Sequence, residues 1–261
     1  MWSKKLKTYS NRIRLTSNRF FIPKKQIKKS SAVLVGSEHH HLSRVVRKKR
    51  GDHINLFTET GENYEARIEK INKSETLLTI WKIKTENKPE TCIRLAPSLI
   101  KAKSLELILK KCTELGVSTF SPVISERTVV NISAKLDKKM KRWNRIVIQA
   151  SKQCQRPCSP VIEKPVSLKK FLGDNRAEFA IFLDESKGES LKNLILCFHE
   201  NKQSPPQDVI ILLGPEGGWT EKEKQDIILH EYKAVNLGTN ILRTETAAVA
   251  CVSIISHFWC F

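Results

Sequence analysis

A continuous apolar segment near the carboxyl end, Val209-Ile210-Ile211-Leu212-Leu213, constrains the fold of this chain more than any other feature. Because the segment has no polar residue, both of its faces must be buried, as in the central strand of a parallel sheet. Gly214 ends the run, and Gly217 and Gly218 follow shortly, which predicts a glycine-bearing loop at the carboxyl end of the strand. Such a strand needs helices on both faces of its sheet, so the pattern predicts an α/β fold.

Strands and helices alternate on both sides of this segment, from about residue 90 to the end of the chain. Apolar residues at helical spacing, with Gly116 placed to end one helix, indicate amphipathic helices between the strands. Thr220 and Glu223 have the spacing of a capping box, which predicts that a helix begins there. Besides the strand at 209–213, the expected strands are 92–96, 120–125, 179–183 and 234–237, and the expected helices are 105–116, 136–154, 191–198, 220–231 and 246–258.

The part of the chain before residue 84 has a different pattern. Short segments with β-strand composition are separated by turns at Gly51, Gly61 and 72–74, which predicts a small β-barrel. The polar residues 84–89 are expected to link it to the α/β part. We therefore expect a basic amino-terminal extension over residues 1–18, a β-barrel domain over 19–84 and an α/β domain over 90–261; the expected barrel strands are 32–35, 53–57, 64–68 and 76–80.

The net charge is strongly positive and unevenly distributed. The chain has 46 Lys and Arg against 27 Asp and Glu, a formal charge of +19, and residues 1–50 contain 15 basic residues and one acidic residue, Glu38. Positive charge concentrated at one end favours a polyanionic partner, because each phosphate neutralised by Lys or Arg releases counterions. RNA or DNA contact is the preferred interpretation, and a solvated lysine-rich surface is the alternative.

Several classes of protein are disfavoured. Seven scattered cysteines, an odd number, argue against a secreted disulfide framework. Cys154 and Cys158 have no second Cys or His pair at zinc-finger spacing, so no metal is expected. The three consecutive histidines at 39–41 are interpreted as a surface or RNA-facing cluster. No apolar run approaches the roughly 20 residues that span a bilayer, so no membrane association is expected. A cytoplasmic protein is expected, although residues 1–18 also resemble an organelle transit peptide.

A second loop follows the last expected strand, with the sequence Leu237-Gly238-Thr239-Asn240-Ile241-Leu242-Arg243-Thr244-Glu245-Thr246-Ala247. In open α/β sheets, ligands bind beyond the carboxyl ends of the strands, so a ligand site between this loop and 213–218 is expected. Neither loop has the Gly-Lys-Ser/Thr ending of a P-loop or a Gly-x-Gly-x-x-Gly fingerprint. Nucleotide hydrolysis is therefore disfavoured.

These two loops resemble those of the SPOUT-class methyltransferases that act on N3 of a uridine in 16S rRNA, the RsmE-type family. Residues 213–218 and 237–247 match the family pattern almost letter for letter. The resemblance also includes 114–117, Ser125-Glu126-Arg127, and Gln153 with Arg156. At the amino end it covers Arg19-Phe20-Phe21 and 41–47, so it extends from about residue 19 to the end.

The resemblance implies a PUA-like β-barrel followed by a SPOUT-type α/β domain with a deep trefoil knot, which pattern alone would not predict. It implies a homodimer with its active site near the subunit interface, and an enzyme that uses S-adenosyl-L-methionine, without a metal, to methylate 16S rRNA, with the small ribosomal subunit as substrate. The implied cofactor-binding residues lie on the two loops: Leu213, Gly214, Pro215, Glu216, Gly217, Leu237, Gly238, Ile241 and Leu242.

Candidate roles in catalysis follow from the need to remove the N3 proton or to stabilise the uracil anion, and the candidate RNA contacts are carried over from this resemblance. Glu245 is the candidate general base or positioning group, with capping of the last helix as the alternative, and Arg243 and Arg156 are candidates for steadying the uracil or a phosphate. Glu216 is expected to brace its loop. The candidate RNA-contacting residues are Arg19, His41, Arg44, Arg47 and Arg127.

Two positions depart from the family pattern: Lys152 stands where a glutamate is usual, and Lys48 replaces an apolar residue. Lys152 leaves the local hydrogen-bond network open. Two other functions remain as alternatives. One is a SPOUT methyltransferase acting on a ribose 2′-oxygen or another base in tRNA or rRNA, and the other is a non-catalytic RNA-binding factor in ribosome assembly.

Overall fold

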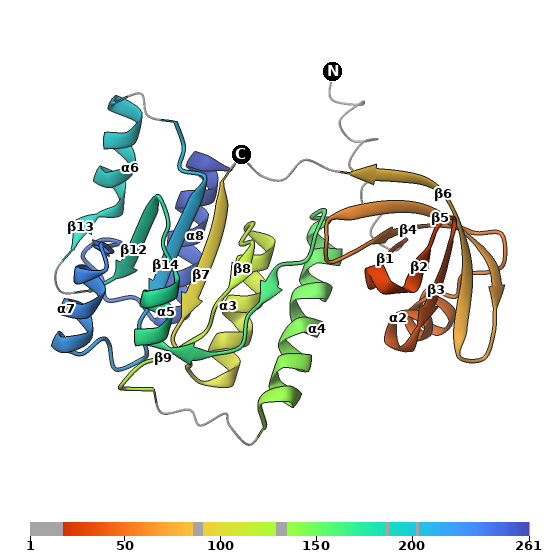
Figure 1. Ribbon diagram of the computed structural model, residues 1–261, viewed down its shortest axis with the longest axis horizontal. Helices are drawn as coiled ribbons and strands as arrows, with labels where there is room; N and C mark the ends of the chain where they lie inside the picture. Colours follow the sequence, from red (N-terminus) through yellow and green to blue (C-terminus); the bar gives the residue numbers. More distant parts are fainter. Residues whose placement is uncertain (1–17, 86–90, 129–134, 186–187, 202–203, 261) are drawn as a thin grey trace. The chain divides into compact units, whose positions relative to one another are not determined.

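The computed structural model describes residues 18–85, 91–128, 135–185, 188–201 and 204–260, and the basic extension expected over residues 1–18 lies almost entirely outside these ranges. The chain divides into two compact units (Figure 1). The first contains the residues up to 87 together with 151–159, and the second contains 88–150 and 160–261. Residues 151–159 thus group with the first unit, whereas the sequence analysis placed them in the second domain.

The first unit is a six-stranded sheet in the order β1-β4-β5-β6-β3-β2. Its strands alternate inward apolar and outward polar residues, and the inward set, including Phe20, Leu34, Leu56 and Ile68, forms one core. All neighbouring strands are antiparallel except β1, which pairs in parallel with β4. The bounds are β1 Arg19–Phe21, η1 Lys24–Gln26, β2 Ile27–Lys28, β3 Ser31–Val35, α2 Gly36–His40, η2 His41–Val45, β4 His53–Phe57, β5 Glu62–Ile71 and β6 Glu75–Thr85.

The second unit is built on a seven-stranded parallel sheet in the order β10-β8-β7-β14-β12-β15-β13. Figure 1 shows β14 near the middle of this sheet, between β7 and β12. The strands of this sheet are β7 Cys92–Pro97, β8 Thr119–Phe120, β10 Val161–Ile162, β12 Phe179–Leu183, β13 Glu189–Ser190, β14 Asp208–Leu213 and β15 Lys233–Asn236. Two further strands, β9 Val123–Ile124 and β11 Val166–Ser167, form a separate parallel pair. The helices are α3 Ala102–Glu114, α4 Leu136–Cys154, α5 Leu168–Asp174, α6 Leu191–Glu200, α7 Glu221–Leu229 and α8 Thr244–Trp259.

Alternate side chains of β14 enter two different cores, which explains its unbroken apolar sequence. Val209, Ile211 and Leu213 pack in the core that includes residues of α3, α4, α6 and α8. Ile210 and Leu212 pack in the core that includes residues of α5 and α7. The prediction of a strand with helices on both faces is therefore confirmed, as is the expectation of an α/β domain preceded in the chain by a smaller β domain.

The structure corrects two local expectations. The strand expected over 120–125 is two short strands, β8 and β9, separated by Ser121 and Pro122, because a proline has no N–H for a sheet ladder. The last helix begins at Thr244 and not at 246, which places Glu245 in its first turn. The Thr220–Glu223 capping box is present as predicted, and Gly116 ends α3 with a positive φ of 102°.

Candidate functional site

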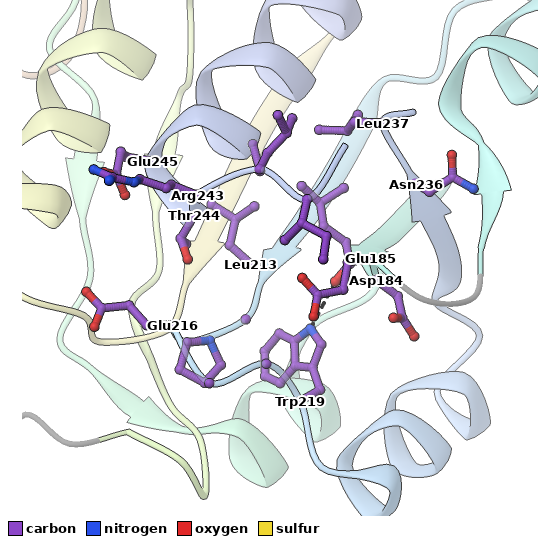
Figure 2. A pocket seen from close by; sticks show the side chains of 18 of the residues that line it. Asp184, Glu185, Leu213, Glu216, Trp219, Asn236, Leu237, Arg243, Thr244 and Glu245 are labelled. Carbon is purple, nitrogen blue, oxygen red and sulfur yellow. Dashed lines mark hydrogen bonds between the residues drawn. The ribbon is translucent and has the colours of Figure 1, made fainter. Parts of the chain in front are cut away.

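A cavity of about 850 Å³ lies beyond the carboxyl ends of three neighbouring strands, β12, β14 and β15 (Figure 2). Each strand contributes the residues that follow it, so the sheet order brings segments distant in sequence to one place. All nine residues predicted to bind the cofactor line this cavity, namely Leu213, Gly214, Pro215, Glu216, Gly217, Leu237, Gly238, Ile241 and Leu242. Arg243 and Glu245 line it as well.

The first loop is held against the end of β12 by Trp219. The buried indole donates a hydrogen bond from Nε1 to the carbonyl oxygen of Leu183, at 3.2 Å. Gly214 packs directly on this indole: a Cβ at position 214 would lie 3.1 Å from Trp219 Nε1. Position 214 is therefore glycine because of the close approach of the indole, and the loop has little room to shift.

Arg127 and Lys101 hold the loop from outside the sheet. Arg127 donates from Nη1 to the carbonyl oxygen of Gly217 at 2.7 Å. Lys101 pairs with Glu216 at 3.0 Å, which fits the predicted bracing role of Glu216, although both side chains are well exposed and such a pair contributes little. The structure thus places Arg127, predicted to contact RNA, in the wall of the cavity.

A buried carboxylate fixes the segment that carries Arg127. Glu223, the capping-box residue of α7, is 8% exposed and accepts hydrogen bonds from the backbone N–H groups of Glu126, at 2.8 Å, and Thr220, at 2.9 Å. One carboxylate therefore ties the start of α7 to the residues before Arg127. This supports the same loop from a second side.

An acidic side chain, Asp184, borders the opposite part of the cavity and was not singled out from the sequence. Its carboxylate is buried and pairs with Lys224 of α7 at 2.9 Å. Burial alone would lower the pKa of Lys224, but the hydrogen bond to Asp184 raises it above its ordinary value, so the ammonium stays charged. Asp184 directly follows the end of a predicted strand, and this position could have marked it as a candidate site residue. Its pairing with Lys224, 40 residues away, has no signal in the sequence.

The second loop is more open. Gly238 has a φ of +130°, a conformation that favours glycine, and the side chain of Ile241 is 78% exposed. Arg243 is the N-cap residue of α8, and Glu245 lies in its first turn, where a carboxylate is favourable. In Figure 2, Arg243 and Glu245 lie across the pocket from Asp184, so acidic groups border the cavity on two sides.

Arg156 is not among the residues that line the cavity; it belongs to the first unit. Its carbonyl oxygen accepts a hydrogen bond from the guanidinium of Arg19. Arg19 is only 8% exposed and its guanidinium lies over the Phe57 ring, 4.3 Å from the centroid. Its burial and its acceptors favour a structural role for Arg19 over the predicted RNA contact.

The other predicted RNA contacts of the first unit have different environments. Arg44 and Arg47 are exposed, as an RNA contact requires. His41 is half-buried, and burial, followed by the nearby Lys152 ammonium, lowers its pKa, so it adds no positive charge near neutral pH. The interpretation of 39–41 as one surface cluster is wrong for His39, which is buried and hydrogen-bonded through Nδ1 to Thr76 at 2.8 Å.

Lys152, which departs from the family pattern, has a defined partner. Its ammonium pairs with Glu38 at 2.9 Å and lies 5.2 Å from the centroid of the Phe20 ring. Glu38 also accepts a hydrogen bond from the backbone N–H of Phe21. The network that the sequence left open is therefore an ion pair within the first unit.

The described residues contain no group of three or more His, Cys, Asp or Glu side chains arranged to hold a metal ion. Within the same ranges, none of the helices has the length and apolar character needed to cross a membrane.

Comparison with known proteins gives consistent matches over most of the chain. The RNA methyltransferase domain family matches residues 86–256, and the RNA methyltransferase PUA domain family matches residues 36–80. Ribosomal RNA small subunit methyltransferase E of Aquifex aeolicus is 34% identical, over 82% of this chain and 90% of the relative. The protein of the same name from Mesomycoplasma hyopneumoniae is 33% identical, over 88% of this chain and 95% of that relative. The crystal structure of the Neisseria gonorrhoeae enzyme of that name, bound to S-adenosyl methionine, has a TM-score of 0.81 at 29% identity and covers 93% of this chain and 98% of that chain.

Proposed function

The chain belongs to the ribosomal RNA small subunit methyltransferase E family, and on that premise we propose that it transfers a methyl group from S-adenosyl-L-methionine to N3 of a uridine in 16S rRNA. The observation that carries the proposal is the single cavity that all nine predicted cofactor residues line. The match covers 95% and 90% of two relatives, so it includes both the first and the second unit of this chain.

The cavity fits this cofactor in three respects. Its volume of about 850 Å³ is within the range usual for small-molecule sites. Gly214 lets the loop backbone lie close to the Trp219 indole, and Gly238 has a positive φ, with no atom within 4 Å of the position that a Cβ would take. Glu185 supplies an acidic group at the wall, which suits a ligand with positively charged centres, whereas Asp184 is already paired with Lys224. When bound, S-adenosyl-L-methionine supplies a methyl group on a positively charged sulfur.

The loops contribute mainly by orientation. A rigid first loop, fixed by Trp219, Arg127 and Glu223, holds its backbone groups in place before any ligand arrives. Alignment of two reactants in this way contributes roughly 7–11 kcal/mol in favourable cases.

The uracil N3 proton must be removed as the new N–C bond forms. Glu245, at the wall of the cavity, is the group proposed to accept this proton or to position its acceptor, and Arg243 is proposed to stabilise negative charge on the uracil oxygens. Both residues come from the start of α8, where the helix N-terminus adds favourable positive potential for an anion.

We further propose that the protein acts as a homodimer. The family resemblance implies an active site near a subunit interface, and Arg156, a predicted catalytic residue that belongs to the first unit, is proposed to act there. The exposed apolar side chain of Ile241, beside the pocket, is consistent with such an interface. The assembled small ribosomal subunit is the proposed substrate and the cytoplasm the proposed location.

The experiment that tests the proposal is incubation of unmodified small ribosomal subunits with the protein and S-adenosyl-L-methionine, followed by mass spectrometry of the nucleosides. N3-methyluridine at one position is expected. A methylated ribose or another methylated base would show a different SPOUT activity. Absence of both methylation and cofactor binding would indicate a non-catalytic assembly factor.

A further inference from the structure

The first unit exposes a tryptophan on its outer face. Trp81, in β6, is 47% exposed, whereas Trp143, Trp219 and Trp259 in the second unit are 4–5% exposed. Large aromatic side chains contribute strongly to binding when they become covered, so an exposed indole on a sheet surface marks a possible contact site. Nothing in the proposed methyl transfer uses this residue.

The backbone turns Trp81 outward at a β-bulge. Glu65 of β5 pairs with Lys82 and Ala66 pairs with Ile80, so Trp81 is the extra residue between the two pairs. Bulges commonly redirect a side chain in this way. The strand therefore interrupts its regular alternation at the residue that carries the indole.

Two neighbours hold the indole in a defined orientation. Its Nε1–H donates to a carboxylate oxygen of Glu65 at 3.3 Å. Its ring meets the imidazole of His53 edge-on, with centroids 4.7 Å apart and an angle of 61° between planes. A ring fixed on two sides loses less conformational entropy when a ligand covers it.

Exposed cations surround this aromatic pair. His53 is opposite Arg67 in the pairing of β4 with β5, and Lys82 follows Trp81 directly; both cationic side chains are exposed. Arg67 reaches the turn before β4, since its Nη2 lies 3.8 Å from the Cβ position of Gly51. That turn carries further basic side chains at Arg47, Lys48, Lys49 and Arg50. We call Trp81, His53, Arg67 and Lys82 the Trp81 patch.

We propose that the Trp81 patch binds single-stranded RNA by stacking an unpaired base on the indole while Arg67 and Lys82 contact the flanking phosphates. Aromatic faces next to cations are the usual means of binding single strands, and the contact tolerates any base. The proposal rests on the proposed function for the identity of the polymer. It adds a contact in the first unit that is separate from the methyl-transfer cavity.

The test measures binding of a dye-labelled single-stranded oligouridylate to the full chain by fluorescence anisotropy, so that variants without Trp81 can be compared. Quenching of Trp81 emission is followed separately. All variants are made in a Trp2→Phe background, which removes the tryptophan outside the described residues. Trp81 is then the only exposed tryptophan among the described residues. RNA is expected to quench the emission of Trp81. Trp81→Ala is expected to weaken binding about 5- to 100-fold, the range for loss of one stacked base, while Trp81→Phe retains most of the affinity.

Ile83→Ala is the matched control, because Ile83 lies on the same strand and is 58% exposed but cannot stack. Unchanged affinity for this variant and a loss for Trp81→Ala would support the proposal. Equal affinities for Trp81→Ala and the background protein would overturn it, as would quenching by ribosomal proteins but not by RNA. N3-methyluridine formation by the background protein, measured in parallel, separates failure of this site from failure of the proposed function.

Discussion

The two loops that line the cavity are held in different ways. Loop 214–219 is fixed by its own chain: Trp219 bonds to Leu183, and Arg127 bonds to Gly217. In loop 237–243, by contrast, Ile241 is 78% exposed and Gly238 has a left-handed φ. One wall of the site is therefore braced by side chains from other elements, and we expect the other, more exposed wall to adjust when a ligand binds.

This difference separates binding from chemistry. The fixed loop offers backbone groups and a close-packed indole, which suit recognition of one small molecule. The open loop leads into α8 and carries Arg243 and Glu245, the residues proposed to act on the uracil. Changes in the first loop should alter cofactor affinity, and changes in the second should alter the rate.

The largest expected effect is on the second loop. Glu245→Gln is expected to lower the methylation rate about 100-fold, because proton removal by a positioned group contributes about that much or more. Cofactor affinity should be unchanged. Single-turnover kinetics with small subunits measures the rate, and calorimetry measures the affinity.

An unchanged rate for Glu245→Gln would leave this carboxylate with only its helix-terminal role. In that case its removal should reduce stability by about 0.3–1 kcal/mol, which thermal unfolding can detect.

The next effect is on the first loop. Gly214→Ala is expected to weaken cofactor binding about tenfold, because the added methyl would lie 3.1 Å from Trp219 Nε1 and overpacking typically costs about 1–3 kcal/mol. Gly173→Ala is the matched control, since a Cβ at position 173 meets no atom within 4 Å. Calorimetric titration measures the cofactor affinity of both variants. Equal affinities would refute the close-packing argument.

A smaller effect is expected at the outer brace of the same loop. Arg127→Gln removes the hydrogen bond to the Gly217 carbonyl and should weaken cofactor binding about threefold, because one partly exposed hydrogen bond contributes about 0.5–1.5 kcal/mol. Lys101→Gln removes only an exposed ion pair and should leave the affinity unchanged. The reverse order of these two effects would show that the wrong side chain has been assigned as the brace.

The smallest effect is expected at the tip of the open loop. For the dilute, monomeric chain, Ile241→Ser should change the free energy of unfolding by less than about 0.5 kcal/mol, because this side chain is 78% exposed in the single chain. Chemical denaturation measures this free energy. At higher protein concentration the proposed dimer predicts a larger loss, and the same small change at every concentration would place Ile241 outside the dimer interface.

The sequence predicted the features that depend on local order. The apolar run of β14 follows from burial on two faces, and the Thr220–Glu223 capping box from a spacing of three residues. The two glycine loops could be placed because each follows a predicted strand. The α/β fold and the two loops of the cavity wall were therefore accessible from local patterns, whereas the individual cofactor-binding residues were taken from the family resemblance.

Contacts between distant residues were not accessible in this way. Asp184 pairs with Lys224, and Lys152 pairs with Glu38 across 114 positions, without any periodic pattern that marks the partners. The burial of Arg19 was missed for the same reason, since it depends on acceptors in residues 156 and 157. In a positively charged segment, the sequence alone does not distinguish a buried structural arginine from an exposed arginine that could contact RNA.

The most direct test of the account is hydrogen exchange of the backbone amides in 213–219 and 237–243, with and without S-adenosyl-L-methionine. Without the cofactor, we expect slow exchange in the first loop and fast exchange in the second. With the cofactor, both loops should be protected, and the larger change should occur in 237–243. Cofactor binding that protects neither loop would contradict the assignment of this cavity as the methyl-donor site.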